Sequence, residues 1–236
     1  MDDFERYGDY NEIDESPAKS PVLAFIRTVC VILVFSVIGF IAFRVFTFNY
    51  YPDSVKELYF NDTLTDFYNE REGDIDALTQ SLRAPYDDEN KGNFFCDNLI
   101  IIPELSQLQV SLRYNTSLIE SLKSELKLDD LSADDPGSFS FRLYTSGESE
   151  NEEDHIVGRL DYVGFDSFLM YRYYKLVFDD VDFKMDSDDK VNWIRLEIFV
   201  KGADSDKPYS MVAIYENNEN FDTFKEYKLS GGERPQ

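Results

Sequence analysis

The feature that most constrains this chain is an uncharged apolar run near its N-terminus. Residues 28–43 carry no charge, and an arginine flanks the run at each end. These sixteen residues would cover roughly 24 Å of a hydrocarbon layer that is about 30 Å thick. Apolar neighbours extend the run on both sides, and both arginine side chains can reach the headgroups. We therefore predict a transmembrane anchor over residues 22–51, in contact with the lipid bilayer through residues 22–48.

Bulky aromatic residues follow the run, and they favour an anchor that is not cleaved. Phe46, Phe48, Tyr50 and Tyr51 gather where amphipathic rings prefer the membrane interface, and Pro52 then ends the helix. A cleaved signal peptide would instead have a basic leader and small residues after the apolar run. A buried core helix is the other alternative, but a segment that is apolar all round disfavours it.

The orientation of the anchor follows less directly from the sequence. Lys19 and Arg27 on one side are nearly balanced by Arg44 and Lys56 on the other, so the positive-inside rule gives little preference. We expect a cytoplasmic N-terminus and an extracytoplasmic C-terminal domain, which is the usual outcome for an N-terminal anchor followed by one large domain. Residues 1–21 hold seven acids and two bases, and this composition predicts a disordered acidic tail.

The charge of the chain excludes one class of partner. With 47 acidic and 23 basic side chains the net charge is -24, which repels a polyphosphate backbone, so we expect no nucleic-acid partner. Two cysteines, of which Cys30 lies in the apolar run, cannot form a disulfide framework. Phe, Tyr and Trp make up 16% of the residues and favour β-structure.

Period-two alternation dominates the second half of the chain and predicts strands. Val110, Phe141 and Leu196 fall on predicted inward faces. We expect a mainly β fold, an antiparallel Ig-like β-sandwich over residues 84–232 with one inserted helix. The predicted strands lie near residues 95–102, 108–112, 139–143, 156–163, 167–178, 192–200, 209–216 and 224–229.

Helical spacing appears in two places. Over residues 117–127 apolar residues recur on one face, and Ser117 and Glu120 can form a capping box. Residues 52–83 predict a juxtamembrane segment with two short helices, the second of which follows Asp74. We expect this segment to pack on the domain that follows.

One stretch of the sequence resembles known proteins. Residues 83–115, RAPYDDENKGNFFCDNLIIIPELSQLQVSLRYN, resemble stretches in uncharacterised single-pass membrane proteins of Gram-positive, Firmicutes-like bacteria. The resemblance implies a location in the bacterial envelope. It implies no activity, no cofactor and no site residue.

The sequence offers no recognisable catalytic motif, so we predict a protein that is not an enzyme and assign no catalytic residue. His155 could be paired with Cys96 as nucleophile and Asp154 as orienting acid, but no local signature supports this arrangement. A histidine beside a solvated acidic loop is the simpler interpretation. No P-loop, zinc-protease or dinucleotide pattern is present.

The densest acidic cluster is a candidate cation site. Carboxylate oxygens from a loop could hold Ca²⁺, although the spacing does not fit an EF-hand. A hydrated loop of repelling charges is the alternative, and we expect no other cofactor. The cluster consists of Asp179, Asp180, Asp182, Asp186, Asp188 and Asp189.

Outward-facing aromatic residues are the candidate binding residues. Trp193 and Phe199 share the outward face of one predicted strand, and Tyr144 points outward from another. Such rings bind a protein partner or stack on a sugar, unless helices of the same chain cover them. We expect a non-enzymatic, membrane-anchored, extracytoplasmic protein-interaction module of the cell envelope. The alternative is a carbohydrate-binding module that faces cell-wall or other glycans, and an enzyme comes third.

Overall fold

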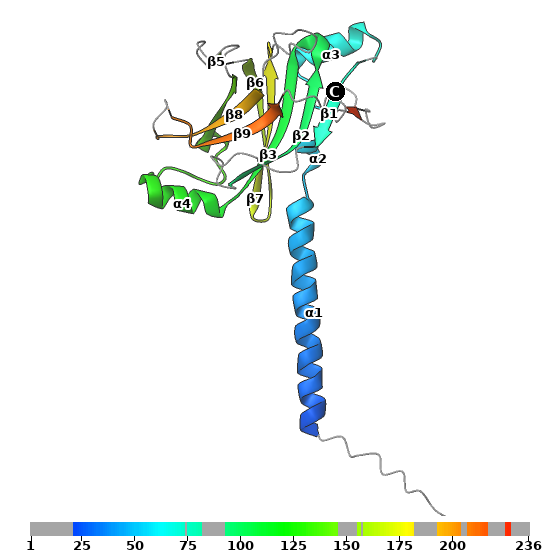
Figure 1. The fold of residues 1–236 in the computed structure, drawn as a ribbon, viewed down its shortest axis with the longest axis vertical. Helices are drawn as coiled ribbons and strands as arrows, with labels where there is room; N and C mark the ends of the chain where they lie inside the picture. The colour runs from blue at the N-terminus through cyan, green and yellow to red at the C-terminus, as the bar shows by residue number, and fades with distance from the viewer. Residues whose placement is uncertain are drawn as a thin grey trace, which may run out of the picture. The chain divides into compact units, whose positions relative to one another are not determined.

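A computed structural model describes most of the chain (Figure 1). At Trp193 and His155 it describes the backbone alone. The chain divides into two compact units, Met1–Tyr50 and Tyr51–Gln236, which we describe separately. The described residues are 21–73, 75–81, 93–145, 155–156, 158–181, 193–203, 207–216 and 225–227.

The first unit contains helix α1 (Pro21–Asn49), whose 29 residues span roughly 44 Å. Its large apolar side chains are exposed around the whole helix. The Thr28 hydroxyl donates to the Ala24 carbonyl at 3.0 Å, so this polar group is satisfied within the helix. By length and composition α1 could be a membrane anchor or a signal sequence. The predicted acidic tail over residues 1–21 lies outside the described residues except for Pro21.

The second unit contains two antiparallel sheets. The six-stranded sheet has the order β10 (Lys225–Glu226), β1 (Leu78–Ser81), β2 (Phe94–Ile102), β3 (Gln107–Asn115), β7 (Tyr171–Asp179) and β6 (Arg159–Phe168). The four-stranded sheet has the order β5 (His155–Ile156), β4 (Phe139–Thr145), β8 (Trp193–Val200) and β9 (Ser210–Glu216). The prediction of antiparallel strands is confirmed.

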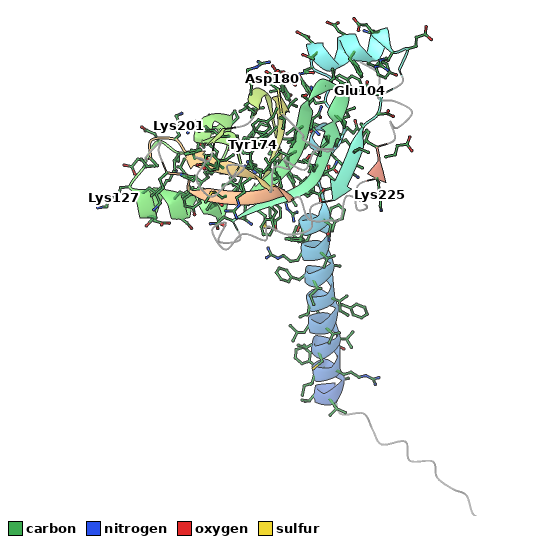
Figure 2. All side chains as sticks on the ribbon, turned by 45° about the horizontal axis from the view of Figure 1, so that its top comes forward. Glu104, Lys127, Tyr174, Asp180, Lys201 and Lys225 are labelled. Atoms are coloured by element: carbon green, nitrogen blue, oxygen red, sulfur yellow. The ribbon has the colours of Figure 1, made fainter. Side chains whose placement is uncertain are left out.

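One hydrophobic core is shared by the two sheets. Val110, Phe141 and Leu196 are all buried in it, which confirms the predicted inward faces of β3, β4 and β8. Near its centre the Tyr174 ring meets the Phe141 ring edge-on, with centroids 4.9 Å apart. Figure 2 shows Tyr174 among the packed side chains of this unit.

Helix α4 (Ser117–Leu126) adds Leu118, Ile119 and Leu122 to this core. It is the inserted helix that the spacing predicts, but the predicted capping box is wrong. Thr116 is the N-cap residue, and the side chain of Asn115 accepts the Ser117 N–H at 3.0 Å instead. Two short 3-10 helices, η2 (Pro103–Leu105) and η3 (Pro136–Ser138), complete the connections near the core.

The segment before the first long strand contains α2 (Asp53–Lys56) and α3 (Asp62–Glu70). The predicted helix after Asp74 is wrong, because residues Leu78–Ser81 of that stretch form strand β1. Leu78 pairs with Ile101 of β2 on one side and with Glu226 of β10 on the other. Main-chain bonding to two neighbours therefore overrides the helical spacing of the leucines.

Candidate functional site

On strands β3 and β7 the outer face of the six-stranded sheet, which looks away from the shared core, is mostly polar and yet buried. The same face also carries the buried apolar residues Val177 on β7 and Ile100 and Ile102 on β2. Sheet faces that pack against protein usually carry apolar residues. We therefore take this face and its cover as the candidate site. Its polar residues, each at most 5% exposed, are Gln107, Gln109, Ser111 and Arg113 on β3 with Tyr173, Lys175 and Asp179 on β7.

The residues that precede α3 cover this face, and we call residues 51–61 the strap. The side-chain amide of Gln109 binds both main-chain groups of Tyr59: it accepts the N–H at 2.9 Å and donates to the carbonyl at 2.7 Å. The Ser111 hydroxyl donates to the Val55 carbonyl. Bonds of this kind fix the path of the strap without selecting its side chains.

The first residue of the strap is held by its ring. The Arg113 guanidinium carbon lies 5.0 Å from the ring centroid of Tyr51 and also faces the rings of Phe95 and Tyr171 at 5.4 and 5.1 Å. Tyr51 donates its hydroxyl to the Phe95 carbonyl at 3.3 Å and meets the Tyr173 ring edge-on. Burial raises the pKa of Tyr51 well above its usual range, although the Arg113 charge opposes this. Cation–π contacts with a desolvated guanidinium are stabilising, so Tyr51 is an anchor point of the strap.

The other ring of the strap contacts strand β6. Tyr59 stacks on Tyr162 with centroids 3.6 Å apart and planes inclined by 8°. Between Tyr51 and Tyr59 in the sequence, the Ser54 hydroxyl donates to the carboxylate of Asp166, which is also on β6. The strap thus contacts β3, β7 and β6 through separate side chains.

A hydrogen-bond network closes the end of the strap. Asn61, the N-cap residue of α3, accepts the Leu64 N–H and donates to Asp161 at 2.8 Å and to Asp179 at 3.2 Å. Gln107 donates to the second oxygen of Asp179 at 2.8 Å. Both oxygens of this buried carboxylate are therefore hydrogen-bonded, as a buried charge requires.

The acidic cluster predicted as a calcium site is placed only in part. Asp179 lies in the network above, and Asp180 pairs with Arg159 at 3.4 Å. Among the described residues no group of three or more carboxylate, histidine or cysteine side chains could hold a metal ion. The four other aspartates of the cluster lie outside the described residues: Asp182, Asp186, Asp188 and Asp189.

The predicted aromatic binding face has a different setting from the expected one. Phe199 is only 5% exposed, with the Arg142 guanidinium 4.4 Å from its ring centroid. Tyr144 is partly exposed, and the side chain of Trp193 lies outside the described residues. The burial of Phe199 agrees with the alternative stated above, in which the outward aromatic residues are covered within the same chain.

Cys96 is placed where it cannot act as a nucleophile. Its side chain is buried in the shared core, and burial raises the pKa of the thiol to about 12. The thiolate is the reactive form, so this thiol stays inert at physiological pH. The side chains of His155 and Asp154 lie outside the described residues.

Strand β6 forms an edge of the six-stranded sheet, and no described strand pairs with it on the side away from β7. Val163 on β6 is 38% exposed, and Leu169 in the following turn is 55% exposed. Val163 and Leu169 are the two exposed large apolar side chains in the described part of Tyr51–Gln236. An uncovered edge with apolar side chains can pair with another chain.

Alternation on β3 did not predict the strap, yet the sequence carries a signal for it. Three of the four outward residues, Gln107, Gln109 and Ser111, are uncharged, and Arg113 is the fourth, in a chain of which 30% is charged. A solvated face would carry more of those charges. Neutral amide and hydroxyl groups suit a face whose hydrogen-bond partners are main-chain groups of another segment.

Comparison with known proteins assigns no family to the chain. No protein-family model, no curated protein and no solved structure matches it.

Proposed function

We propose that this chain is a membrane-anchored, extracytoplasmic protein-interaction module of the cell envelope that has no catalytic activity of its own. The exposed apolar surface of α1 supports a bilayer as its surroundings, because such a surface is not stable in water. The bulky rings that follow α1 support an anchor that is retained rather than cleaved.

The observation that carries the binding function is the edge strand β6. Its ten residues offer main-chain groups for strand addition, and Val163 and Leu169 offer apolar contact beside them. Natural proteins usually protect long edges with charges and bulges, and the first part of β6 is protected in this way, by Arg159, Asp161 and an irregularity between Leu160 and Tyr162. From Val163 to Phe168 the strand carries one charge, that of Asp166, so this part of the edge supports a protein partner.

The carbohydrate-binding alternative has less support. Stacking on a sugar ring needs an exposed aromatic face, and the burial of Phe199 removes one of its three proposed rings. The fold that we propose for the domain is the Ig-like sandwich, supported by two antiparallel sheets that share one core.

Site-specific photo-crosslinking tests the binding function in the cell that makes the protein. A photo-reactive amino acid is placed at Val163 or Leu169 of the full-length chain, and at the exposed Ser124 on α4 as a control. We expect one discrete crosslinked product from the two edge positions and none from Ser124. Val163→Lys should remove the product formed through Leu169, because a charge on the edge opposes pairing. The same products at all three positions, or none at the edge, would contradict the proposal.

A further inference from the structure

We propose that strand β6 pairs with β6 of a second copy of this chain, in an antiparallel register centred on Phe165. The two copies would then share one continuous sheet across a two-fold axis. This inference rests on the proposed protein-binding function and names the partner at the β6 edge. On the anchored chain that we propose, confinement of both copies to one bilayer raises their effective concentration.

Every second residue of β6 points its main-chain groups away from β7. Leu169 and Met170 form the turn between the two strands, and Phe168 pairs with Tyr171 on either side of it. Residues that flank a two-residue turn exchange hydrogen bonds, and along an antiparallel ladder such bonded pairs recur at every second residue. The N–H and carbonyl groups that point away from β7 are therefore those of three residues: Val163, Phe165 and Ser167.

A register centred on Phe165 gives each residue a complementary neighbour in the second copy. The two Phe165 residues lie opposite each other, and Val163 lies opposite Ser167, so main-chain groups that face the edge meet one another. On the outer face Tyr162 lies opposite Phe168, an aromatic pair of the kind that stabilises antiparallel strands. The segment is complementary to itself, as a two-fold interface requires.

Charge favours this register in an acidic chain. The net charge of -24 opposes the association of two copies, so a surface with few acids is the one that can bring them together. Asp166 lies opposite Gly164 of the second copy, and the neighbour of Gly164 on β7 is Lys175. A register centred on Asp166 would instead place the two carboxylates opposite each other, which is destabilising.

The irregularity in β6 excludes the shift in the other direction. With Phe165 at the centre, the paired residues run from Tyr162 to Phe168 and leave the irregularity between Leu160 and Tyr162 outside the pair. A register centred on Gly164 would bring that irregularity opposite the end of the strand in the second copy, where it opposes pairing.

The same register covers the exposed apolar side chains of the edge. Val163 lies opposite Ser167 of the second copy, so Leu169 of that copy, two positions further on, is its diagonal neighbour. Both side chains are exposed in the single copy. Contact between them removes apolar surface from water on both sides of the two-fold axis, which stabilises the pair.

Disulfide trapping in membranes tests the register on the full-length chain, in a Cys30→Ala background. Val163 and Ser167 are both exposed, so cysteine at these positions leaves the core intact. Opposite each other they would have Cα atoms about 5.5 Å apart, within reach of a disulfide. Oxidation of Val163→Cys/Ser167→Cys should give a covalent dimer that a reductant dissociates.

The two single variants are the matched controls. In either one the cysteines of the two copies are four positions out of register, roughly 14 Å apart along the strands, so at least tenfold less dimer should form. No dimer from the double variant, or as much dimer from Val163→Cys alone, would overturn the proposal.

Photo-crosslinking at Val163 separates this inference from the proposed function. A second copy gives a product of twice the mass of the chain. If the double cysteine variant stays monomeric while Val163 crosslinks to a different protein, the second copy is refuted and the protein-binding function stands. If neither experiment gives a product, both are refuted.

Discussion

At the scale of single residues, the centre of the shared core gives the clearest expectation for stability. Phe141 is buried against Tyr174, whereas its neighbour Ser140 is exposed. We expect Phe141→Ala to lower the free energy of unfolding by about 3 to 5 kcal/mol, because it leaves a cavity. Ser140→Ala should change it by less than about 0.5 kcal/mol. Chemical denaturation of both variants measures this, and equal losses would show that the register of β4 is shifted by one residue.

The buried thiol gives a second expectation at this scale. In a Cys30→Ala variant, Cys96 is the remaining thiol of the chain. With its pKa raised to about 12, it should resist a thiol reagent at pH 8 until the domain unfolds. Labelling kinetics measure this, and a labelling rate that exceeds the unfolding rate would contradict the burial of Cys96.

The raised pKa of Cys96 makes its contribution to the free energy of unfolding fall as the pH rises. The unfolded thiol loses its proton near its ordinary pKa of about 8.5, whereas the folded thiol keeps its proton up to about pH 12. The unfolded state therefore binds fewer protons in this window, and the thiol lowers stability as the pH rises through it. Cys96→Ala should lose less stability than the wild-type protein between these pH values, and denaturation at several pH values measures the difference.

Alternation could predict which residues of a strand face the core, and little more. It placed Val110 and Leu196 correctly, because the side-chain period of a strand is two whatever the strand pairs with. It could not show that Gln109 is buried, since its cover comes from residues fifty positions earlier in the chain. Nor could it place Phe199, whose outward direction does not decide its exposure.

At the scale of elements, α1 carries the expectation that separates an anchor from a soluble helix. Arginine in place of Val34 or Ile38 puts a charge in the middle of the apolar run. On the insertion scale this costs about 2.5 to 3.5 kcal/mol, so the variants should be released from membranes. Membrane fractionation measures the release, with Val34→Leu as a control. Unchanged retention of the arginine variants would argue against a membrane span.

The elements themselves could be predicted to different extents. Strands β3, β4 and β8 followed from alternation over several residues, whereas β1 was predicted as a helix because Leu78 and Leu82 lie four apart. The pairing of β1 with β2 and β10 determines that this segment is a strand, and those partners are distant in sequence. The strap was expected to pack on the domain, but neither its route nor its ring contacts could be derived from local pattern.

At the scale of the whole molecule, the orientation in the membrane can be measured with a single cysteine. Ser124 is exposed on α4, and Ser124→Cys changes one atom of a side chain. Ser124→Cys is made together with Cys30→Ala, which removes the exposed thiol, while the buried Cys96 adds no background. If the domain is extracytoplasmic, a membrane-impermeant maleimide should label this variant in intact cells. Labelling that occurs only after the cells are lysed would place the domain inside.

The contacts of the strap also bear on the order of folding. The Tyr59 N–H is held by Gln109, fifty positions later in the chain, and the Ser54 hydroxyl donates to Asp166, 112 positions later. Contacts between residues this far apart close long loops, which costs conformational entropy. The strap can therefore take its place only after β3 and β6 have been synthesised, although it precedes both strands in the chain.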